Sequence, residues 1–210
     1  MKNHVINVSL AALLCGSSFA ASLITSGDPV TGITFDGTSF TVSTQSNYGN
    51  NETPVQAIDG STSTKYFHNG GPNTGLVVRP LAFYTANSVT QSIVTGFSLT
   101  TANDNDGRDP LTFSIYGTNV ANSTTFGDYT AIVLGQATLA PTARFTSSTL
   151  VSFANTTAFN TYAIIFPTVR SENTMQVAEI RLEGTAIPEP SAALLGGLGI
   201  LTLLVRRRRA

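Results

Sequence analysis

The chain has 210 residues and a mass of 22.0 kDa, enough for one ordinary domain with short additional segments at its ends. Hydrophobic residues make up 41% of the sequence and charged residues only 11%, which excludes a disordered chain and a long coiled coil. Residues 21–186 carry six basic and eleven acidic side chains, a net charge of −5. A nucleic-acid partner is therefore not expected, because few cations are present to neutralise phosphates.

Residues 1–20 have the organisation of a secretory signal peptide. Lys2 gives a basic start, an apolar stretch runs over 5–14, and small residues end the segment at Ala20, where a signal peptidase would cleave. An ordinary N-terminal helix is the alternative. Cleavage after Ala20 leaves a mature chain without cysteine, because Cys15 is the only one in the sequence.

Between residues 21 and 186, apolar and polar side chains alternate with a period of two, and turn residues separate the alternating stretches. This pattern predicts eight strands: Ile33–Val42, Leu76–Tyr84, Ser92–Thr101, Leu111–Thr118, Tyr129–Leu134, Thr149–Phe153, Tyr162–Phe166 and Met175–Glu183. Eight short strands in one uninterrupted region predict a single all-β domain, an antiparallel β-sandwich of the jelly-roll kind.

Three sequence phrases follow one another between Thr53 and Gly184. The first is an Ala-x-Asp-Gly loop that ends in Lys65-Tyr66, the second runs from Thr-Ala-Asn-Asp through Arg-Asp-Pro to Tyr-Gly-Thr-Asn, and the third is Val-Ala-Glu-Ile-Arg-Leu-Glu-Gly at 177–184. In this order they resemble the discoidin, or coagulation factor 5/8 type C, group of galactose-binding-like sandwiches. The resemblance implies a non-catalytic binding module. The sequence departs from that group in lacking tryptophan, so that Tyr66 stands where the group usually has one.

The loop after Ala57 offers oxygen ligands for a metal ion. An aspartate and a glycine are followed by four hydroxyl residues, and this set of carboxylate, carbonyl and hydroxyl oxygens suits Ca²⁺. In carbohydrate-binding relatives with such a loop, the loop and a glutamate of the final strand hold a structural calcium. The resemblance thus implies a calcium site of five residues: Ala57, Asp59, Ser61, Thr64 and Glu179. The alternative is a plain turn in which Asp59 caps its own backbone.

A second acidic stretch contains Asp104, Asp106 and Asp109. Their spacing does not match an EF-hand, and we expect a solvated acidic loop rather than a second cation site. Arg108 lies between these carboxylates, where it is a candidate either for pairing with them or for contacting a ligand.

Phe67, His68 and Asn69, followed by two glycines, form the best candidate for a loop that contacts a ligand. An aromatic ring can stack on a sugar, while histidine and asparagine hydrogen-bond to hydroxyls. Tyr48, which lies among asparagines, is a further candidate of this kind. A flexible loop with one exposed histidine is the alternative.

Few residues are available for catalysis. After removal of residues 1–20, His68 is the only histidine and no cysteine remains, which excludes Cys–His nucleophilic sites and His-rich zinc sites. A Ser-His-Asp triad built on His68 would lack the Gly-x-Ser-x-Gly elbow, whereas a carboxylate pair for glycoside hydrolysis stays open. The sequence therefore predicts a non-catalytic protein, with a polysaccharide-acting enzyme as the alternative.

The end of the chain has three parts. Pro188, Glu189 and Pro190 are followed by 15 uncharged residues and then by four arginines: Arg206, Arg207, Arg208 and Arg209. As a helix the uncharged stretch would span ~22 Å, somewhat less than a ~30 Å hydrocarbon core, with the arginines on the cytoplasmic side. Residues 187–210 closely resemble the PEP-CTERM sorting signal of Gram-negative bacteria that make exopolysaccharide, which implies recognition and removal by an exosortase. A plain single-span anchor is the alternative.

These features divide the chain into a signal peptide (1–20), a β-sandwich domain (21–186) and a sorting signal (187–210). We expect an exported, non-catalytic protein that is transiently anchored in the inner membrane and reaches the surface or extracellular matrix of a Gram-negative bacterium. The expected ligand is carbohydrate, in particular exopolysaccharide, bound by loops at one end of the sandwich. A structural or adhesive biofilm matrix protein without a defined ligand is the alternative.

Overall fold

The computed structural model of the protein describes residues 22–43, 51–80 and 91–187. The expected signal peptide, the sorting residues from Pro188 onward and Tyr48 lie outside these ranges. Within them, no helix has the length and apolar character needed to cross a membrane.

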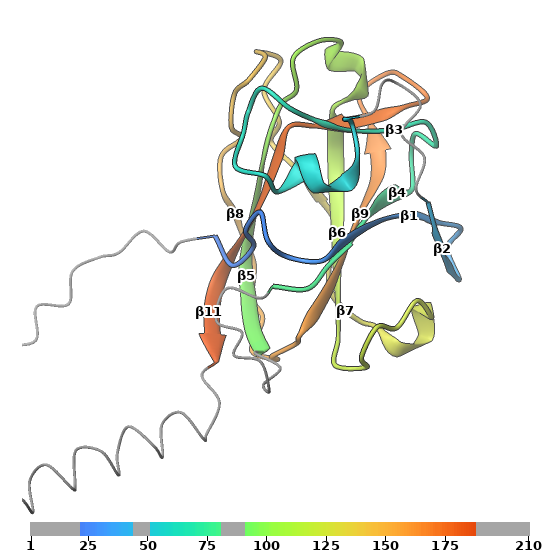
Figure 1. Cartoon of the computed structure of the whole chain (residues 1–210), viewed down its shortest axis with the longest axis vertical. Helices are drawn as coiled ribbons and strands as arrows, with labels where there is room; N and C mark the ends of the chain where they lie inside the picture. Colours follow the sequence, from blue (N-terminus) through green and yellow to red (C-terminus); the bar gives the residue numbers. More distant parts are fainter. Residues whose placement is uncertain (1–21, 44–50, 81–90, 188–210) are drawn as a thin grey trace, which may run out of the picture.

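The described strands form three antiparallel sheets (Figure 1). The largest has the order β2-β1-β4-β9-β6-β7 and consists of β1 (Val30–Phe35), β2 (Phe40–Val42), β4 (Thr74–Val78), β6 (Pro110–Thr118), β7 (Thr130–Ala137) and β9 (Thr161–Val169). The second has the order β11-β5-β8, with β5 (Gln91–Thr100), β8 (Val151–Ser152) and β11 (Glu179–Ile187). The third pairs β3 (Tyr66–His68) with β10 (Met175–Val177), and three 3₁₀ helices lie in connections: η1 (Pro54–Ala57), η2 (Asp106–Arg108) and η3 (Phe126–Asp128). The predicted all-β, antiparallel sandwich is confirmed.

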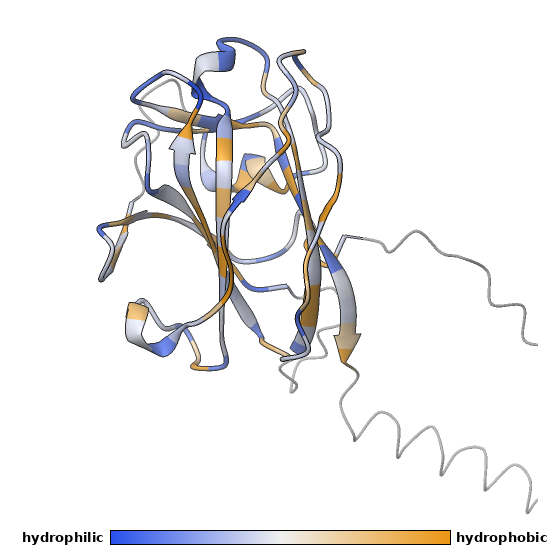
Figure 2. Ribbon diagram, turned by 180° about the vertical axis from the view of Figure 1, so that it is seen from behind, coloured by the Kyte–Doolittle hydropathy of each residue, from blue (hydrophilic) through white to orange (hydrophobic). Residues whose placement is uncertain are grey.

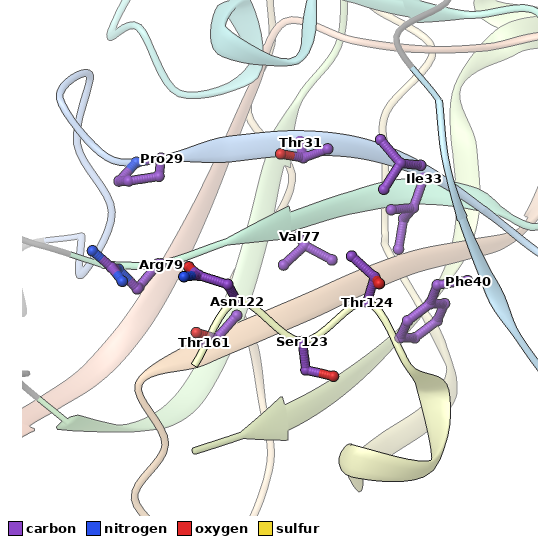
Figure 3. Close-up of a pocket in the computed structure, with 11 residues that line it drawn as sticks. Pro29, Thr31, Ile33, Phe40, Val77, Arg79, Asn122, Ser123, Thr124 and Thr161 are labelled. Carbon is purple, nitrogen blue, oxygen red and sulfur yellow. The ribbon is translucent and has the colours of Figure 1, made fainter. Parts of the chain in front are cut away.

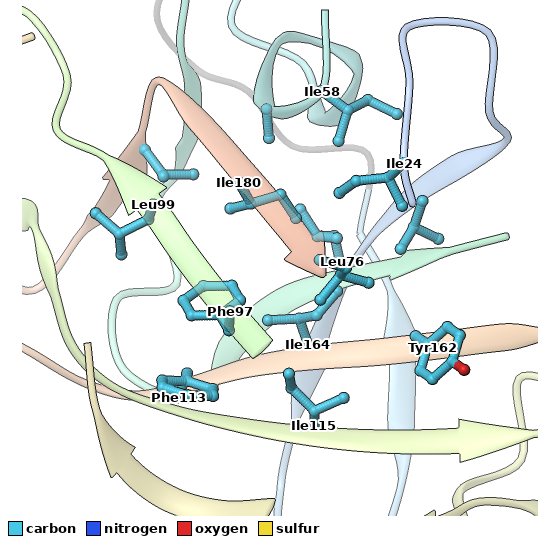
Figure 4. Close-up of a cluster of buried hydrophobic side chains, with 14 of the residues drawn as sticks. Ile24, Ile58, Leu76, Phe97, Leu99, Phe113, Ile115, Tyr162, Ile164 and Ile180 are labelled. Atoms are coloured by element: carbon cyan, nitrogen blue, oxygen red, sulfur yellow. The ribbon is translucent and has the colours of Figure 1, made fainter. Parts of the chain in front are cut away.

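The main core lies between the six-stranded and the three-stranded sheet. Figure 4 shows Phe97 and Leu99 of β5 on one side of it and Phe113 and Ile115 of β6 on the other, all of them buried. The rings of Phe97 and Phe113 stack with their centroids 4.3 Å apart. Hydrophobic positions follow the strands while hydrophilic residues gather in the loops, as Figure 2 shows. Burial of each such side chain stabilises the fold by about 1.5–3 kcal/mol.

The six-stranded sheet is apolar on both of its faces. Along β9, Tyr162, Ile164 and Phe166 belong to the main core, whereas Ala163 and Ile165 belong to a second buried cluster on the opposite, outer face. This outer cluster also contains residues from β1, β2, β6 and the segment that leads into β7: Ile33, Phe35, Phe40, Tyr116, Phe126 and Tyr129. Because both faces of β9 are covered, its sequence is almost continuously apolar.

The predicted strand Ile33–Val42 is wrong, because the chain reverses within it. β1 and β2 form a hairpin in which the Asp36 carboxylate accepts hydrogen bonds from the backbone N–H groups of Thr38 (2.8 Å) and Ser39 (2.7 Å). Gly37 has a φ of +97°, which a residue without a side chain adopts most easily. The Asp-Gly pair therefore makes a tight turn that the apolar pattern alone conceals.

The predicted strand Met175–Glu183 is also wrong, because it is divided between two sheets. β10 pairs with β3, and β11 pairs with β5; between them the Ala178 N–H donates to the Thr100 carbonyl at 2.9 Å. The sequence did not predict β3, since three residues are too short to show a period. Of the predicted strand Thr149–Phe153, only Val151 and Ser152 form β8. Of the predicted strand Leu76–Tyr84, only the part up to Val78 belongs to β4, and residues 81–84 lie outside the described ranges.

We expect Phe97→Ala to lower the free energy of unfolding by about 3–5 kcal/mol, because it removes a fully buried ring and leaves a cavity against Phe113. Chemical denaturation monitored by circular dichroism measures this change. Phe145→Ala, at a ring that is 50% exposed, is the matched control and should change stability by less than about 1 kcal/mol. Equal losses in the two variants would contradict the assigned core.

Candidate functional site

Asp59 and Glu179 bring two carboxyl groups together where the loop after η1 meets the start of β11. Glu179 Oε1 accepts hydrogen bonds from the backbone N–H groups of Gly60 (2.8 Å) and Ser61 (3.0 Å). Asp59 Oδ1 accepts from the same Ser61 N–H at 2.8 Å, and Asp59 Oδ2 accepts from the Thr64 hydroxyl at 2.8 Å. Four of the five residues predicted for a calcium site thus lie together, and Asp59 also caps its own backbone as the alternative predicted.

This carboxylate pair has the chemistry of a site for a hard cation. Burial, with the neighbouring Asp59 carboxyl, raises the pKa of Glu179 to about 8. With this pKa Glu179 keeps its proton at neutral pH, so a divalent cation would have to displace that proton. The surrounding hydroxyl and carbonyl oxygens are ligands that Ca²⁺ prefers. Ala57, the fifth predicted residue, is buried at the end of η1. The described residues contain no group of three or more His, Cys, Asp or Glu side chains that could hold a metal ion. A calcium ion here would thus have two carboxyl groups, of Asp59 and Glu179, and otherwise only neutral oxygens as ligands.

The predicted ligand loop is wrong for Phe67 and His68. Both belong to β3 and are buried, with exposed fractions of 0% and 2%. The Arg108 guanidinium lies over the Phe67 ring, 5.3 Å from its centroid, and its Nη1 is 3.5 Å from Asp104 Oδ2. Arg108 thus makes the structural pairing that the sequence offered as one of its two roles. Asn69 follows β3 and is half-buried.

His68 lies beside a serine, but its hydrogen bonds run in the wrong direction for catalysis. Its Nε2 is 2.9 Å from the Ser43 hydroxyl, and its Nδ1 accepts the Gly70 backbone N–H at 2.8 Å. A neutral ring that accepts at Nδ1 carries its proton on Nε2, so it donates to Ser43 and cannot take the proton of that hydroxyl. Burial lowers the pKa of His68, which favours this neutral form. The pair is a structural contact between β3 and the end of the β1–β2 hairpin.

The expectation of a solvated acidic loop holds for Asp104 and Asp106, whose side chains are 45% and 48% exposed, and is wrong for Asp109, which is buried; all three aspartates lie beside cations. Asp104 accepts a hydrogen bond from Lys65 Nζ at 2.8 Å, and Asp106 lies 3.8 Å from Arg170 Nε. Asp109 is fully buried and accepts two hydrogen bonds from the Arg144 guanidinium. These cations come from distant parts of the sequence, so that no local spacing could have indicated them. The end of the sandwich predicted to bind a ligand is instead held together by internal ion pairs.

A cavity of about 360 Å³ lies on the outer face of the six-stranded sheet, beside the outer cluster (Figure 3). We call it the outer-face cavity. Its lining comes from β1, β2, β4, the start of β9 and the segment after β6: Pro29, Thr31, Ile33, Phe40, Val42, Val77, Arg79, Asn122, Ser123, Thr124 and Thr161. Aliphatic side chains form its floor, Phe40 and Arg79 lie at opposite ends, and polar groups of 122–124 form its rim. Sequence analysis missed this cavity because its lining comes from five segments spread between residues 29 and 161 of the sequence.

The aromatic end of the outer-face cavity is rigid. The Phe40 ring packs edge-on against Phe126 and Tyr129, each with a centroid distance of 5.1 Å. On the rim, the Ser123 hydroxyl is held by the Asp128 carboxylate. The side chains of Asn122 and Thr124 are exposed and make no hydrogen bond to another described residue. The cavity therefore combines a fixed apolar surface with polar groups that are free to bind a ligand.

Solved structures with the same fold include sugar-binding proteins. CpGH89CBM32-5 from Clostridium perfringens, solved in complex with GalNAc-β-1,3-galactose, has a TM-score of 0.53 and 11% identity, covering 78% of this chain and 100% of that chain. Chitosan-binding module 1 of a chitosanase/glucanase from Paenibacillus sp. IK-5 has a TM-score of 0.52 and 14% identity over 79% and 99%. A serum fucolectin of striped bass, Morone saxatilis, has a TM-score of 0.54 and 13% identity over 80% of this chain and 50% of that chain.

These likenesses confirm the galactose-binding-like sandwich expected from the discoidin resemblance. No family model matches the chain, and no curated protein matches it by sequence.

We expect the stability that His68 contributes to depend on pH. Because burial lowers the pKa of its imidazole below the unfolded value of 6.5, the unfolded chain binds the proton more readily, and acid favours unfolding. The stability advantage of the wild type over His68→Gln should therefore be greatest above pH 7 and shrink as the pH falls below 6.5. Urea denaturation of both proteins between pH 5.5 and 8 measures it. A difference that stays constant over this range would contradict a buried, neutral histidine.

Proposed function

We propose that this protein is a non-catalytic carbohydrate-binding module that takes a sugar ring into the outer-face cavity. The observation that carries this proposal is the lining of the cavity, in which an aliphatic and aromatic floor faces a rim of amide and hydroxyl groups. A sugar ring has the complementary form, since its C–H groups make an apolar face and its hydroxyls lie around the edge. The Val77 and Ile33 side chains would pack against that face, and the free groups of the rim would bond the hydroxyls.

The shared fold supports a binding role. Two of the similar structures are covered over almost their whole length, and their names describe one in complex with GalNAc-β-1,3-galactose and the other as a chitosan-binding module. Catalysis has less support, because the described Ser43–His68 pair has the proton on the wrong nitrogen for a general base.

We also propose that Ca²⁺ braces the loop after η1 against β11. Asp59 and Glu179 would supply carboxylates, Thr64 a hydroxyl, and Ala57 and Ser61 carbonyl oxygens. When bound, the ion would neutralise the two facing carboxyl groups. The support for this site is their close approach inside one hydrogen-bonded loop. The ion would have a structural role, because it would join two segments that are far apart in the sequence: Gly60 and Glu179 are 119 residues apart.

We further propose that the sandwich acts outside the cell, where exopolysaccharide is the ligand. The signal-peptide pattern of residues 1–20 and the Pro-Glu-Pro, apolar and arginine parts of residues 187–210 support this destination. An exosortase would remove the tail during export.

We expect the purified protein to be retarded by at least one polysaccharide in affinity electrophoresis, and Asn122→Ala/Thr124→Ala to weaken this binding roughly tenfold. The two substitutions remove free hydrogen-bonding groups worth about 0.5–1.5 kcal/mol each. Asn103→Ala, at an exposed asparagine of the opposite loop end, is the control and should bind as the wild type does.

If Asn103→Ala lost binding while Asn122→Ala/Thr124→Ala kept it, the sugar would bind at that loop end, and the assignment of binding to the outer-face cavity would be wrong. Absence of retardation on every polysaccharide of a panel containing galactans, chitosan and the host's own exopolysaccharide would reject the binding role and favour a matrix protein without a defined ligand.

For the calcium site, we expect added Ca²⁺ to raise the melting temperature of the protein and EDTA to reverse the rise, because an ion that binds only the folded state stabilises it. Asp59→Asn and Glu179→Gln should abolish this response. The matched control is Glu183→Gln, four residues further along β11, which should keep the response to Ca²⁺. Identical melting temperatures of the wild type in Ca²⁺ and in EDTA would refute the site.

A further inference from the structure

Among the described residues that line the outer-face cavity, Arg79 is the only charged one. It directly follows β4, and its backbone N–H donates to the Pro29 carbonyl at 3.0 Å, which fixes its main chain at one end of the cavity. Figure 3 shows its guanidinium beside Asn122 and far from Phe40. The position of this cation relative to the rim is thus set by the fold.

The Arg79 guanidinium has no counter-ion within the part of the chain that the structure describes. Among the described cations, the other half-buried or buried ones form ion pairs: Lys65, Arg108, Arg144 and Arg170. Arg79 forms none. Its Nε is buried without a hydrogen-bond partner, but so are those of Arg108 and Arg170, and the missing counter-ion is therefore what distinguishes Arg79. A guanidinium without a counter-ion can gain a charge-assisted pair from an anionic ligand.

The geometry and charge of the Arg79 guanidinium favour a carboxylate as the ligand group. A guanidinium presents its N–H donors in a planar fork that matches the two oxygens of a carboxylate, and such charge-assisted pairs are stronger than neutral hydrogen bonds. The net charge of −5 over residues 21–186 gives the domain no general attraction for anions. Preference for an anion would therefore come from this one position and not from the overall field.

The remainder of the lining restricts what carries the carboxylate. The Thr31, Ile33 and Val77 side chains give an apolar floor, while free polar groups of Asn122 and Thr124 line the rim next to it. An alkyl chain would make no hydrogen bond to these exposed rim groups, whereas a hydroxylated ring could bond them directly. The cavity of about 360 Å³ lies within the range of small-ligand sites, about 300–1,000 Å³.

We infer that the outer-face cavity prefers a sugar ring that bears a carboxylate, a uronic acid unit, with its carboxylate on the Arg79 guanidinium. This inference rests on the proposed carbohydrate binding and names the class of sugar. It makes Arg79 the residue that discriminates acidic from neutral units of otherwise identical rings.

The experiment compares pairs of sugars that differ only at C6. The first pair is oligogalacturonate and the matching neutral galactose oligomer, and the second is the corresponding glucuronate and glucose oligomers. Each is titrated into the full protein by calorimetry. In at least one pair the acidic oligomer should bind at least tenfold more tightly than the neutral one, since a hydrogen bond to a charged group contributes about 1.5–3 kcal/mol. Arg79→Gln should reduce the ratio of acidic to neutral affinity to near one, and Arg79→Lys should give an intermediate ratio, because it keeps the charge but loses the fork. Arg181→Gln, at an exposed arginine of β11, makes the same charge change and should keep the full preference.

The outcomes separate the two proposals. Binding of none of these oligomers by a protein that the polysaccharide panel also fails to retard rejects the proposed function itself. Binding of none of them by a protein that the panel does retard overturns only the inference. Equal binding of acidic and neutral sugars, or a preference that survives in Arg79→Gln, overturns the inference and leaves the proposed function intact. Tighter binding of octanoate than of any uronate also overturns it, because the carboxylate would then belong to an alkyl ligand.

Discussion

The six-stranded sheet is the feature on which the rest of the structure depends, because it is apolar on both faces. Tyr162, Ile164 and Phe166 of β9 need the three-stranded sheet as their partner, and Ala163 and Ile165 need a cover on the other side. The inner face receives a whole sheet. Among the described residues, the outer face is covered by Phe40 of the edge strand β2 and by the segment from β6 to β7, whose aromatic rings close part of it. The outer-face cavity lies beside this smaller cover, so the same constraint that folds the domain also accounts for the cavity that we propose as its ligand site.

The opposite end of the molecule shows why a cluster of charges is not by itself a binding surface. The stretch from Asp104 to Asp109 has the composition of a ligand loop, yet its carboxylates bind Lys65, Arg144 and Arg170 of the same chain. Asp109 is fully buried, where loss of its partner would leave an uncompensated charge. These pairs connect the loop to three distant segments of the chain. The outer-face cavity differs from this loop in that it has polar rim groups that are not paired with other described residues, although they are few.

Sequence reasoning succeeded where a signal repeats and failed where a residue acts alone. The period of two repeats along each long strand, and it predicted the sandwich. The pairing of Asp59 with Glu179 in the proposed calcium site came from the resemblance, since no local pattern joins two residues so distant in sequence. Phe67 was misplaced because β3 spans three residues, too few for alternation to show that they are buried. Arg79 gave no signal at all: its importance lies in the absence of a described counter-ion, which only the arrangement in space reveals.

The carboxylate pair and the outer-face cavity lie on different elements, but β3 connects them mechanically. The loop that holds Asp59 leads into β3, where Tyr66 lies behind β1 and donates its hydroxyl to the Gly75 carbonyl of β4 at 3.3 Å. A Cβ at Gly32 would approach the Tyr66 hydroxyl to 2.5 Å and the Ser43 carbonyl to 2.6 Å, so only glycine permits this contact between Thr31 and Ile33. The floor of the cavity is therefore held from behind by β3, whose own position depends on the preceding loop. If both proposed sites exist, a cation bound to that loop would act on the proposed sugar site through the rigidity of the cavity floor and not through any contact with the ligand.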